Sequence, residues 1–444
     1  MAENKKILRL INPIPNDVKR PSGMAHIFNI IPLQLATVAS VTPENWDIDI
    51  QDENVTAIEH NAKPDLVGIS IKACTANRGI EIANEYKKFN IPVIFGGSHA
   101  SLSPESIKPY ANAVVRGGVE NIWTNLLSDF ESGNLKNIYD GRLYRAIPKY
   151  KMRWELFDKK KYKIFSIIAR RGCSYKCSFC TIPEMYDGVQ SRNIFDVIDD
   201  IQRMESKYFI LWDENPTDNI VYAENFFKAL TPLNKTWFAE ATTKVTENTS
   251  LLNEMGKSGC KAIYLGIESF SQKSLNNVGK GFNKIGRYKD IVKKLGDCGI
   301  MAHAGLVLGL DGDDESTFDE TLEGLYKCNF VSASIKILTP YPGTKLHHRF
   351  EKERRIFDYK LEHYDEKHVV FHPKRMTADQ LYDGYKYVVS NFYSMSSIAT
   401  RIKDNILMHG INPGSFSLVN FGWRKDYFST LLDSRHVYKK VMNK

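Results

Sequence analysis

The sequence has no apolar run long enough to cross a membrane and no signal-peptide pattern at its N-terminus. Its most apolar early stretch, residues 28–41, is interrupted by Pro32 and Gln34. Low-complexity segments and short-period repeats are also missing. These absences predict a globular chain without a transmembrane segment, and the cytoplasm is its default location.

Disulfide candidates are few, because cysteine occurs only seven times among 444 residues. The count is odd, and four of the cysteines are scattered: Cys74, Cys260, Cys298 and Cys328. This pattern argues against a disulfide framework and for a reducing compartment. We expect the scattered cysteines to be small core residues. For Cys74, which follows a predicted strand, core packing is preferred over a place in a crevice.

A dense basic stripe is absent as well. The 60 basic and 52 acidic residues give a net charge of +8, and runs such as residues 159–161 and 293–294 are typical of solvated faces. We therefore expect no nucleic-acid partner. With 43% apolar and 25% charged residues the composition is that of a soluble protein, and the length predicts two or three domains.

Short apolar runs alternate with helical patterns over residues 1–140, which predicts a doubly wound α/β domain with a parallel sheet. The expected strands are residues 6–11, 47–51, 66–70, 92–95 and 113–115, and the clearest helices are residues 76–89 and 120–130. Glycine pairs follow two of the strands, at Gly96-Gly97 and Gly117-Gly118. Ligands of open α/β sheets bind beyond the carboxyl ends of the strands, so these glycines mark a candidate crevice. Tight turns alone would also explain them.

Residues 141–162 are polar and basic without a clear period, and we expect a linker there, packed between two domains. Residues 163–345 again alternate strands and helices, which predicts a partial (β/α)6 barrel with its active site at the carboxyl ends of the strands. The expected strands are residues 164–169, 208–212, 236–241, 262–266, 302–310 and 333–338. Residues 346–444 are predicted to form a C-terminal, mainly helical domain, with helices at 378–392 and 397–408 and one strand-like piece at 368–371.

Three cysteines stand close together after the first barrel strand, as Cys173-x3-Cys177-x2-Cys180. Thiolates are soft ligands that select iron–sulfur clusters, zinc or cuprous copper. Three thiolates on one short loop can bind three irons of a [4Fe–4S] cluster and leave the fourth iron open to a small molecule. A structural zinc site is the main alternative, but zinc normally takes four protein ligands. No histidine occurs between residues 99 and 303, so the fourth ligand would be Cys260 or a distant residue.

The cysteine loop resembles the signature of the radical SAM superfamily, C-x3-C-x2-C with an aromatic residue before the last cysteine, here Phe179. The order of the three parts resembles the cobalamin-binding-domain class of that superfamily. The resemblance implies that Cys173, Cys177 and Cys180 bind a [4Fe–4S] cluster whose open iron is chelated by S-adenosylmethionine (SAM). An electron from the cluster then cleaves SAM to a 5′-deoxyadenosyl radical, while the protein positions the cofactors and excludes water.

Other strand ends carry strings that are similar to family positions around SAM. The second barrel strand ends in Trp-Asp-Glu-Asn, the fourth in Gly-Ile-Glu-Ser, and Leu-Thr-Pro-Tyr-Pro-Gly-Thr follows the sixth. The SAM-binding residues that the resemblance implies are Phe179, Asp213, Glu214, Glu240, Glu268, Ser269, Gly309 and Leu338. For Asp213 and Glu214, a helix cap ahead of Asn219 is the alternative. Glu268, an acidic group in a barrel mouth, needs a partner.

For the first domain the resemblance implies cobalamin, held at Ser70, Gly96, Gly97 and Gly118. Many cobalamin-binding domains carry D-x-H-x-x-G, whose histidine binds cobalt, and this chain has no such string. Members of the radical SAM class often hold cobalamin without that histidine. The string from Gly117 to Glu120, Gly-Gly-Val-Glu, also departs from the more usual G-E-x-E.

The resemblance implies a radical SAM enzyme, with transfer of a methyl group to an unactivated carbon of a small molecule or lipid as the preferred reaction. In that reaction one SAM methylates cobalamin and a second supplies the substrate radical. A dehydration, cyclisation or rearrangement without cobalamin is the alternative, and a non-catalytic zinc-binding scaffold is the alternative from another class. An external electron donor such as flavodoxin or ferredoxin is also expected.

Overall fold

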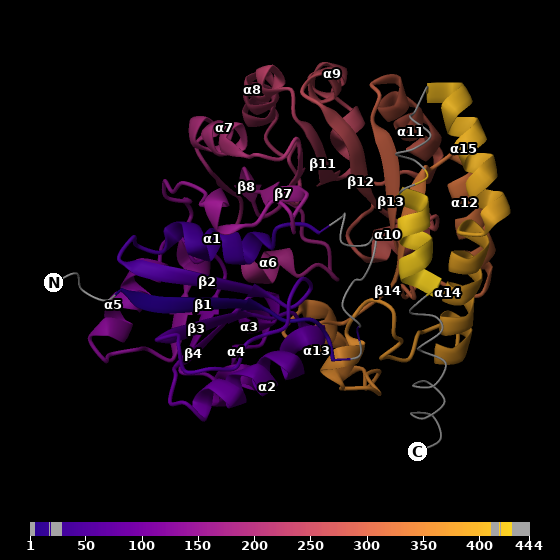
Figure 1. The fold of residues 1–444 in the computed structure, drawn as a ribbon. Helices are drawn as coiled ribbons and strands as arrows, with labels where there is room; N and C mark the ends of the chain where they lie inside the picture. Colours follow the sequence, from indigo (N-terminus) through magenta and orange to yellow (C-terminus); the bar gives the residue numbers. More distant parts are fainter. Residues whose placement is uncertain (1–4, 17, 19–28, 410–416, 418, 429–444) are drawn as a thin grey trace. The chain divides into compact units, whose positions relative to one another are not determined.

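The computed structural model describes residues 5–16, 18, 29–409, 417 and 419–428 (Figure 1). The chain divides into two compact units: unit 1 is Met1–Trp237 with Thr339–Asp365, and unit 2 is Phe238–Leu338 with Glu366–Lys444. The units do not coincide with the domains expected from the sequence. The expected domains were bounded by changes in the pattern of apolar and polar residues, whereas the units are groups of residues that contact one another in the structure. The division into residues 1–140, 163–345 and 346–444 stays a prediction.

Unit 1 begins with a six-stranded parallel sheet in the order β2-β1-β3-β4-β5-β6. Its strands are β1 Lys6–Asn12, β2 Trp46–Asp52, β3 Leu66–Ser70, β4 Val93–Gly96, β5 Ala113–Arg116 and β6 Ile138–Asp140. The helices between them are α1 Leu33–Val41, α2 Ala76–Lys87, α3 Ser98–Leu102, α4 Pro104–Ile107 and α5 Trp123–Glu131. The predicted doubly wound α/β fold is confirmed. Strand β6 was not predicted, because its three residues are too few to show a period.

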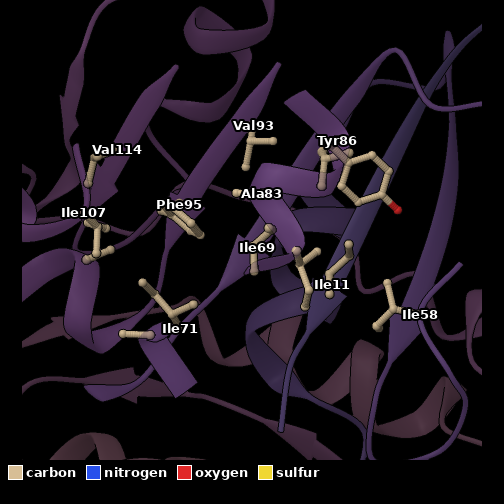
Figure 2. Close-up of a cluster of buried hydrophobic side chains, with 14 of the residues drawn as sticks. Ile11, Ile58, Ile69, Ile71, Ala83, Tyr86, Val93, Phe95, Ile107 and Val114 are labelled. Carbon is tan, nitrogen blue, oxygen red and sulfur yellow. The ribbon is translucent and has the colours of Figure 1, made fainter. Parts of the chain in front are cut away.

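Both faces of this sheet are buried, which explains the nearly continuous apolar runs of β3, β4 and β5. Alternate residues of β1 point to opposite faces: Leu8 and Leu10 pack in the cluster that contains α1 and α5, while Ile11 packs in the cluster that contains α2 and α4. Figure 2 shows the second cluster, in which Ala83 and Tyr86 of α2 lie over the strands. Helices cover both faces, so the strand ends are left for a ligand.

The rest of unit 1 contains the first barrel strands. Its strands are β7 Ile164–Ile167, β8 Arg170–Arg171, β9 Gln190–Ser191 and β10 Tyr208–Leu211, and its helices are α6 Ile182–Met185, α7 Ile194–Arg203, α8 Ile220–Leu230 and α13 Lys345–Lys352. β7 pairs with β10 in parallel and β8 with β9 antiparallel. The side chains of Asn193 and Asn219 accept backbone N–H groups and so begin α7 and α8. In the expected linker, the buried Trp154 indole donates to the Asp200 carbonyl at 2.9 Å, so this segment is part of the packed core.

Unit 2 starts within β11 (Thr236–Ala241). Its further strands are β12 Cys260–Glu268, β13 Met301–Leu308 and β14 Ser332–Ile337, which pair in parallel. Its helices are α9 Thr249–Lys257, α10 Gln272–Asn277, α11 Tyr288–Asp297, α12 Ser316–Lys327, α14 Ala378–Phe392 and α15 Met395–His409. The Tyr393 hydroxyl accepts the N–H of Ala333 and donates to its carbonyl, and Tyr427 does the same at Ile335. The aromatic tail thus satisfies backbone groups of β14, an end strand of its sheet.

The tail is helical as predicted, but the strand expected at residues 368–371 is wrong. These residues are irregular apart from one bridge residue, Phe371, and the apolar run exists because Val369, Val370 and Phe371 are buried. Strand β12 is longer than predicted at both ends. Within the part of the chain that the structure describes, no helix is both long and apolar enough to span a membrane.

Candidate cofactor sites

A cavity of about 840 Å³ lies within unit 1 at the carboxyl ends of β1, β3, β4 and β5. The strand order reverses between β1 and β3, and ligands of open α/β sheets bind at such a switch point. The volume is near the top of the roughly 300–1,000 Å³ of small-molecule pockets. The cavity is therefore suited to a large ligand.

All four residues predicted to hold cobalamin, Ser70, Gly96, Gly97 and Gly118, line this cavity. Gly97 has φ of +96°, and a Cβ there would lie 2.6 Å from the Ile71 carbonyl oxygen, so glycine is required. A Cβ on Gly96 would meet nothing within 4 Å, so this glycine leaves open space that a side chain would fill. The structure brings the four residues together around one hollow. Their contact with cobalamin stays a prediction.

Among the described residues, no histidine lines the cavity. His99, which follows the glycine pair by two positions, is 2% exposed, and its Nε2 lies 3.2 Å from the Ser106 hydroxyl. Burial lowers the pKa of His99 to about 4, so its imidazole is neutral near pH 7. This placement agrees with the absence of D-x-H-x-x-G from the sequence.

One wall of the cavity carries amide side chains that meet at Asp52. Gln34 donates to the Asn12 amide oxygen at 3.1 Å, and Asn12 and Asn54 donate to Asp52 Oδ1 at 2.9 and 2.8 Å. Amides both donate and accept hydrogen bonds, so this wall can bind a ligand that is rich in amide groups, as a corrin is. This wall was not predicted from the sequence. Cys74 also lines the cavity, so its expected core position is wrong.

The cysteine loop lies in unit 1 between β8 and α6. It begins at Gly172, whose φ is +88° and whose Cβ would lie 2.1 Å from the Gly188 carbonyl oxygen. Cys177 is buried, while Cys173, Cys180 and the neighbouring Phe179 are half-buried. The loop thus presents one buried thiol and two half-buried ones, a position in which a cluster is shielded and one iron can stay accessible.

Acidic side chains that follow β10 hold the backbone at the start of this loop and just before β8. Asp213 Oδ1 accepts the N–H of Ala169 at 2.8 Å, and Glu214 Oε2 accepts the N–H of Gly172 at 2.9 Å. Burial raises the pKa of Asp213 to about 7, and burial also raises the pKa of Glu214. Neither carboxylate caps α8, since the side chain of the N-cap residue Asn219 accepts the N–H of Tyr222, so the capping alternative is wrong. Their expected contact with the methionyl amine of SAM stays a prediction.

A fourth zinc ligand from Cys260 does not fit the structure. Cys260 begins β12, at the opposite end of that strand from Glu268, and it is fully buried. Burial raises the pKa of its thiol, so the neutral form is favoured over the thiolate that binds a metal. Cys260, the fourth zinc ligand suggested by the sequence, is therefore unsuitable for a zinc site with the loop cysteines.

The other predicted SAM residues lie in unit 2. Glu268 is 8% exposed, and its carboxylate lies 2.8 Å from the Lys280 ammonium, which is the partner that a buried acid needs. Ser269 and Leu338 are buried, and Glu240 is half-buried on β11.

Gly309 is also in unit 2, and its φ is +93°. Its N–H and that of Leu310 donate to the buried Asp313 carboxylate at 3.0 and 2.9 Å. Burial raises the pKa of Asp313 to about 6. Asp313 therefore fixes the turn after β13. The binding roles of the predicted residues in unit 2 stay predictions.

One buried ion pair beside the cavity was missed by sequence analysis. Arg171, the residue before Gly172, binds both carboxylate oxygens of Glu120, with Nη1 to Oε2 at 2.9 Å. Burial raises the pKa of Glu120, but the guanidinium outweighs burial and leaves the pKa below its usual value. The available signals were the basic residue next to the cysteine loop and the departure from G-E-x-E at residues 117–120.

Comparison with known proteins adds to this geometry. Residues 167–325 match the family model of the radical SAM superfamily, and residues 344–425 match a Domain of unknown function (DUF4070). The chain is 24% identical over 388 residues to bacteriochlorophyllide d C-12(1)-methyltransferase of Chlorobaculum tepidum, covering 84% of this chain and 85% of that protein. It is 26% identical over 385 residues to the anaerobic magnesium-protoporphyrin IX monomethyl ester cyclase of Rubrivivax gelatinosus, covering 78% and 68%.

A solved structure with a similar fold is the radical S-adenosylmethionine methyltransferase TsrM from Kitasatospora setae, with cobalamin and a [4Fe–4S] cluster bound. The TM-score is 0.65 at 14% identity, over 79% of this chain and 75% of that one, which shows a shared fold. The radical SAM match begins in β7, spans the cysteine loop and ends in α12. Residues 167–325 of this chain are therefore a radical SAM domain.

Proposed function

We propose that this chain is a radical SAM enzyme that uses a [4Fe–4S] cluster, SAM and cobalamin to transfer a methyl group to an unactivated carbon of a small molecule or lipid. The proposal is carried by a shared wall within unit 1. Ile168, Arg171, Trp212 and Glu214, which flank or hold the cysteine loop, line the same cavity as the glycines after β4 and β5. A ligand in the cavity would therefore lie beside a cluster on the loop.

When bound, the cluster supplies the electron that cleaves SAM, and cobalamin supplies the carrier for the methyl group. The residues of the chain bind and enclose them. Cys173, Cys177 and Cys180 offer the thiolates. Glu214 holds the first N–H of the loop, and Asp213 holds the N–H of Ala169 just before β8. Apolar residues make up much of the cavity wall and keep water away from a bound ligand.

A second candidate is a cyclisation, which the similarity to the cyclase of Rubrivivax gelatinosus favours. The form of it expected from the sequence alone proceeds without cobalamin. Both reactions need an external electron donor such as flavodoxin or ferredoxin. A reducing compartment such as the cytoplasm fits the cysteine content, because clusters of this kind are labile. The occupant of the cavity distinguishes the two candidates.

Anaerobic purification tests the cluster and the cavity together. We expect a brown protein with about four irons and four sulfides per chain, as three thiolates and an open iron require. After reconstitution with hydroxocobalamin and desalting, corrin absorbance should remain with the protein. Loss of all corrin would favour the cyclisation, and a colourless, zinc-loaded protein would overturn the radical SAM assignment.

Removal of one loop cysteine tests the metal ligands. In Cys177→Ala, production of 5′-deoxyadenosine from SAM should be abolished, because the cluster loses a thiolate. Cys260→Ala is the matched control, since Cys260 is also buried but lies outside the loop, so SAM cleavage should stay intact. If Cys177→Ala cleaves SAM at the native rate, Cys177 is not a ligand.

A further inference from the structure

The ion pair between Arg171 and Glu120 joins the cavity rim to the start of the cysteine loop. Glu120 stands four residues after the end of β5, next to cavity-lining residues. Arg171 itself lines the cavity and is followed directly by Gly172, the first residue of the loop. The side chains are 2% and 10% exposed for Glu120 and Arg171, so solvent does not weaken the pair.

The guanidinium is confined on more than one side. A Cβ on Gly118 would lie 2.1 Å from Arg171 Nη1, so this position must be glycine for the arginine to pass. The Tyr186 ring lies 5.1 Å from the guanidinium carbon, and Tyr186 also lines the cavity. Three residues thus fix the arginine beside the cavity.

A guanidinium that binds both oxygens of a carboxylate is held in orientation as well as in distance. The backbone of Arg171 continues into the cysteine loop, so this orientation is passed to the loop. Glu214 holds the next N–H, that of Gly172, and also lines the cavity. The start of the loop is therefore fixed to the cavity by two side chains, that of Arg171 just before the loop and that of Glu214 from the segment after β10.

We propose that Glu120 is a positioning residue that acts through Arg171 and sets how a cluster on the cysteine loop faces a corrin in the cavity. This inference rests on the proposed function, since it needs both cofactors. It assigns a role to Glu120, and it explains Gly118 by the space that the arginine needs. Glu120 touches neither cofactor in this proposal.

The test uses Glu120→Gln, which keeps the shape of the side chain and removes its charge. Iron content should remain at the native level, because the cysteines are untouched. Corrin affinity should fall by up to about tenfold, because Arg171, which lines the cavity, loses the charge-assisted hydrogen bond that orients it. Electron paramagnetic resonance of bound cob(II)alamin gives a second measurement, the extra relaxation caused by a reduced cluster nearby. In Glu120→Gln the extra relaxation should be weaker, and its rates should cover a wider range, because the cluster is no longer held in one orientation.

Gly118→Ala is a second variant that keeps both charges and displaces the guanidinium, so the test does not depend on whether Glu120→Gln folds. Asp200→Asn is the matched control: Asp200 is 1% exposed, lies 2.6 Å from Arg192, and neither residue lines the cavity. In that pair too an arginine lies over a tyrosine, with Arg192 4.2 Å from the Tyr150 ring.

Native corrin affinity and native relaxation in both Glu120→Gln and Gly118→Ala would overturn the proposal. An equal change in Asp200→Asn would overturn it as well, because the effect would then be general destabilisation. Failure of the unaltered protein to retain corrin is a separate result that refutes the proposed function, and with it any coupling between the two cofactors.

Discussion

Two buried ion pairs, one in each unit, are built on the same three-residue pattern. In unit 1, Gly118-Val119-Glu120 faces Arg171, and in unit 2, Gly266-Ile267-Glu268 faces Lys280. A Cβ on Gly118 would lie 2.1 Å from the arginine, and one on Gly266 would lie 2.7 Å from the Glu268 carboxylate and 2.9 Å from the lysine. Neither glycine has positive φ. Each is therefore needed for the space that an ion pair fills, and not for a turn.

The two pairs differ in the cation. Arg171 offers two nitrogens to two oxygens, while Lys280 contacts the carboxylate through one nitrogen at 2.8 Å and the Gly266 carbonyl at 3.4 Å. A guanidinium is a planar fork, whereas an ammonium is a point charge on a flexible stem. The same G-x-E pattern thus gives a rigid pair beside the cysteine loop and an adjustable one at the end of β12.

The largest effect is expected when one cation is removed. Lys280→Met would leave Glu268 buried without its partner, and breaking a buried pair in this way costs about 3–5 kcal/mol. Hydrogen exchange of the β12 amides would measure the loss as a lower free energy of opening. Lys273→Met is the control, because Lys273 is an exposed lysine on α10. A loss no greater than in the control would contradict the view that Glu268 depends on Lys280.

A smaller effect separates the rigid pair from the adjustable one. Gly118→Ala pushes a methyl group into a planar guanidinium that packs against Tyr186, and such overpacking costs about 1–3 kcal/mol. Gly266→Ala meets the ends of two flexible side chains, which can move, so we expect about 1 kcal/mol or less. Thermal unfolding of both variants under anaerobic conditions measures the difference. Equal losses would remove the distinction between the two cations.

The two ion pairs also differ in how much of each could be predicted from the sequence. The cysteine spacing and the alternation of strands and helices are local patterns, and they were sufficient for the superfamily and for the doubly wound sheet. Glu268 was predicted because it stands in a G-x-E-S string. Glu120 was missed although it has the same spacing, because its partner lies 51 residues away and only the fold brings the two together.

The hydrogen-bond partners of polar side chains at strand ends could not be predicted from the sequence. Asp213 and Glu214 were placed correctly after β10, but their carboxylates accept the backbone N–H groups of residues 44 and 42 positions earlier in the chain, on either side of β8. The amide wall depends in the same way on Asn12 meeting Gln34 and Asp52. A strand end fixes where a side chain starts. Which of several nearby donors it meets depends on how the following loops pack.

The smallest effect is expected from salt, and it tests whether the two pairs share the burial that makes them comparable. The side chains of Glu268 and Lys280 are each 10% exposed, and those of Glu120 and Arg171 are 2% and 10% exposed. Dissolved ions screen exposed charges far more than buried ones. Raising NaCl from about 0.1 M to about 1 M should therefore change either coupling energy, measured in a double-mutant cycle, by less than about 0.5 kcal/mol. The exposed pair between Lys293 and Asp297 on α11 is the control and should lose its small coupling at high salt. A strong salt dependence at Glu268 alone would show that its pair opens to solvent and that the likeness of the two G-x-E strings ends at the sequence.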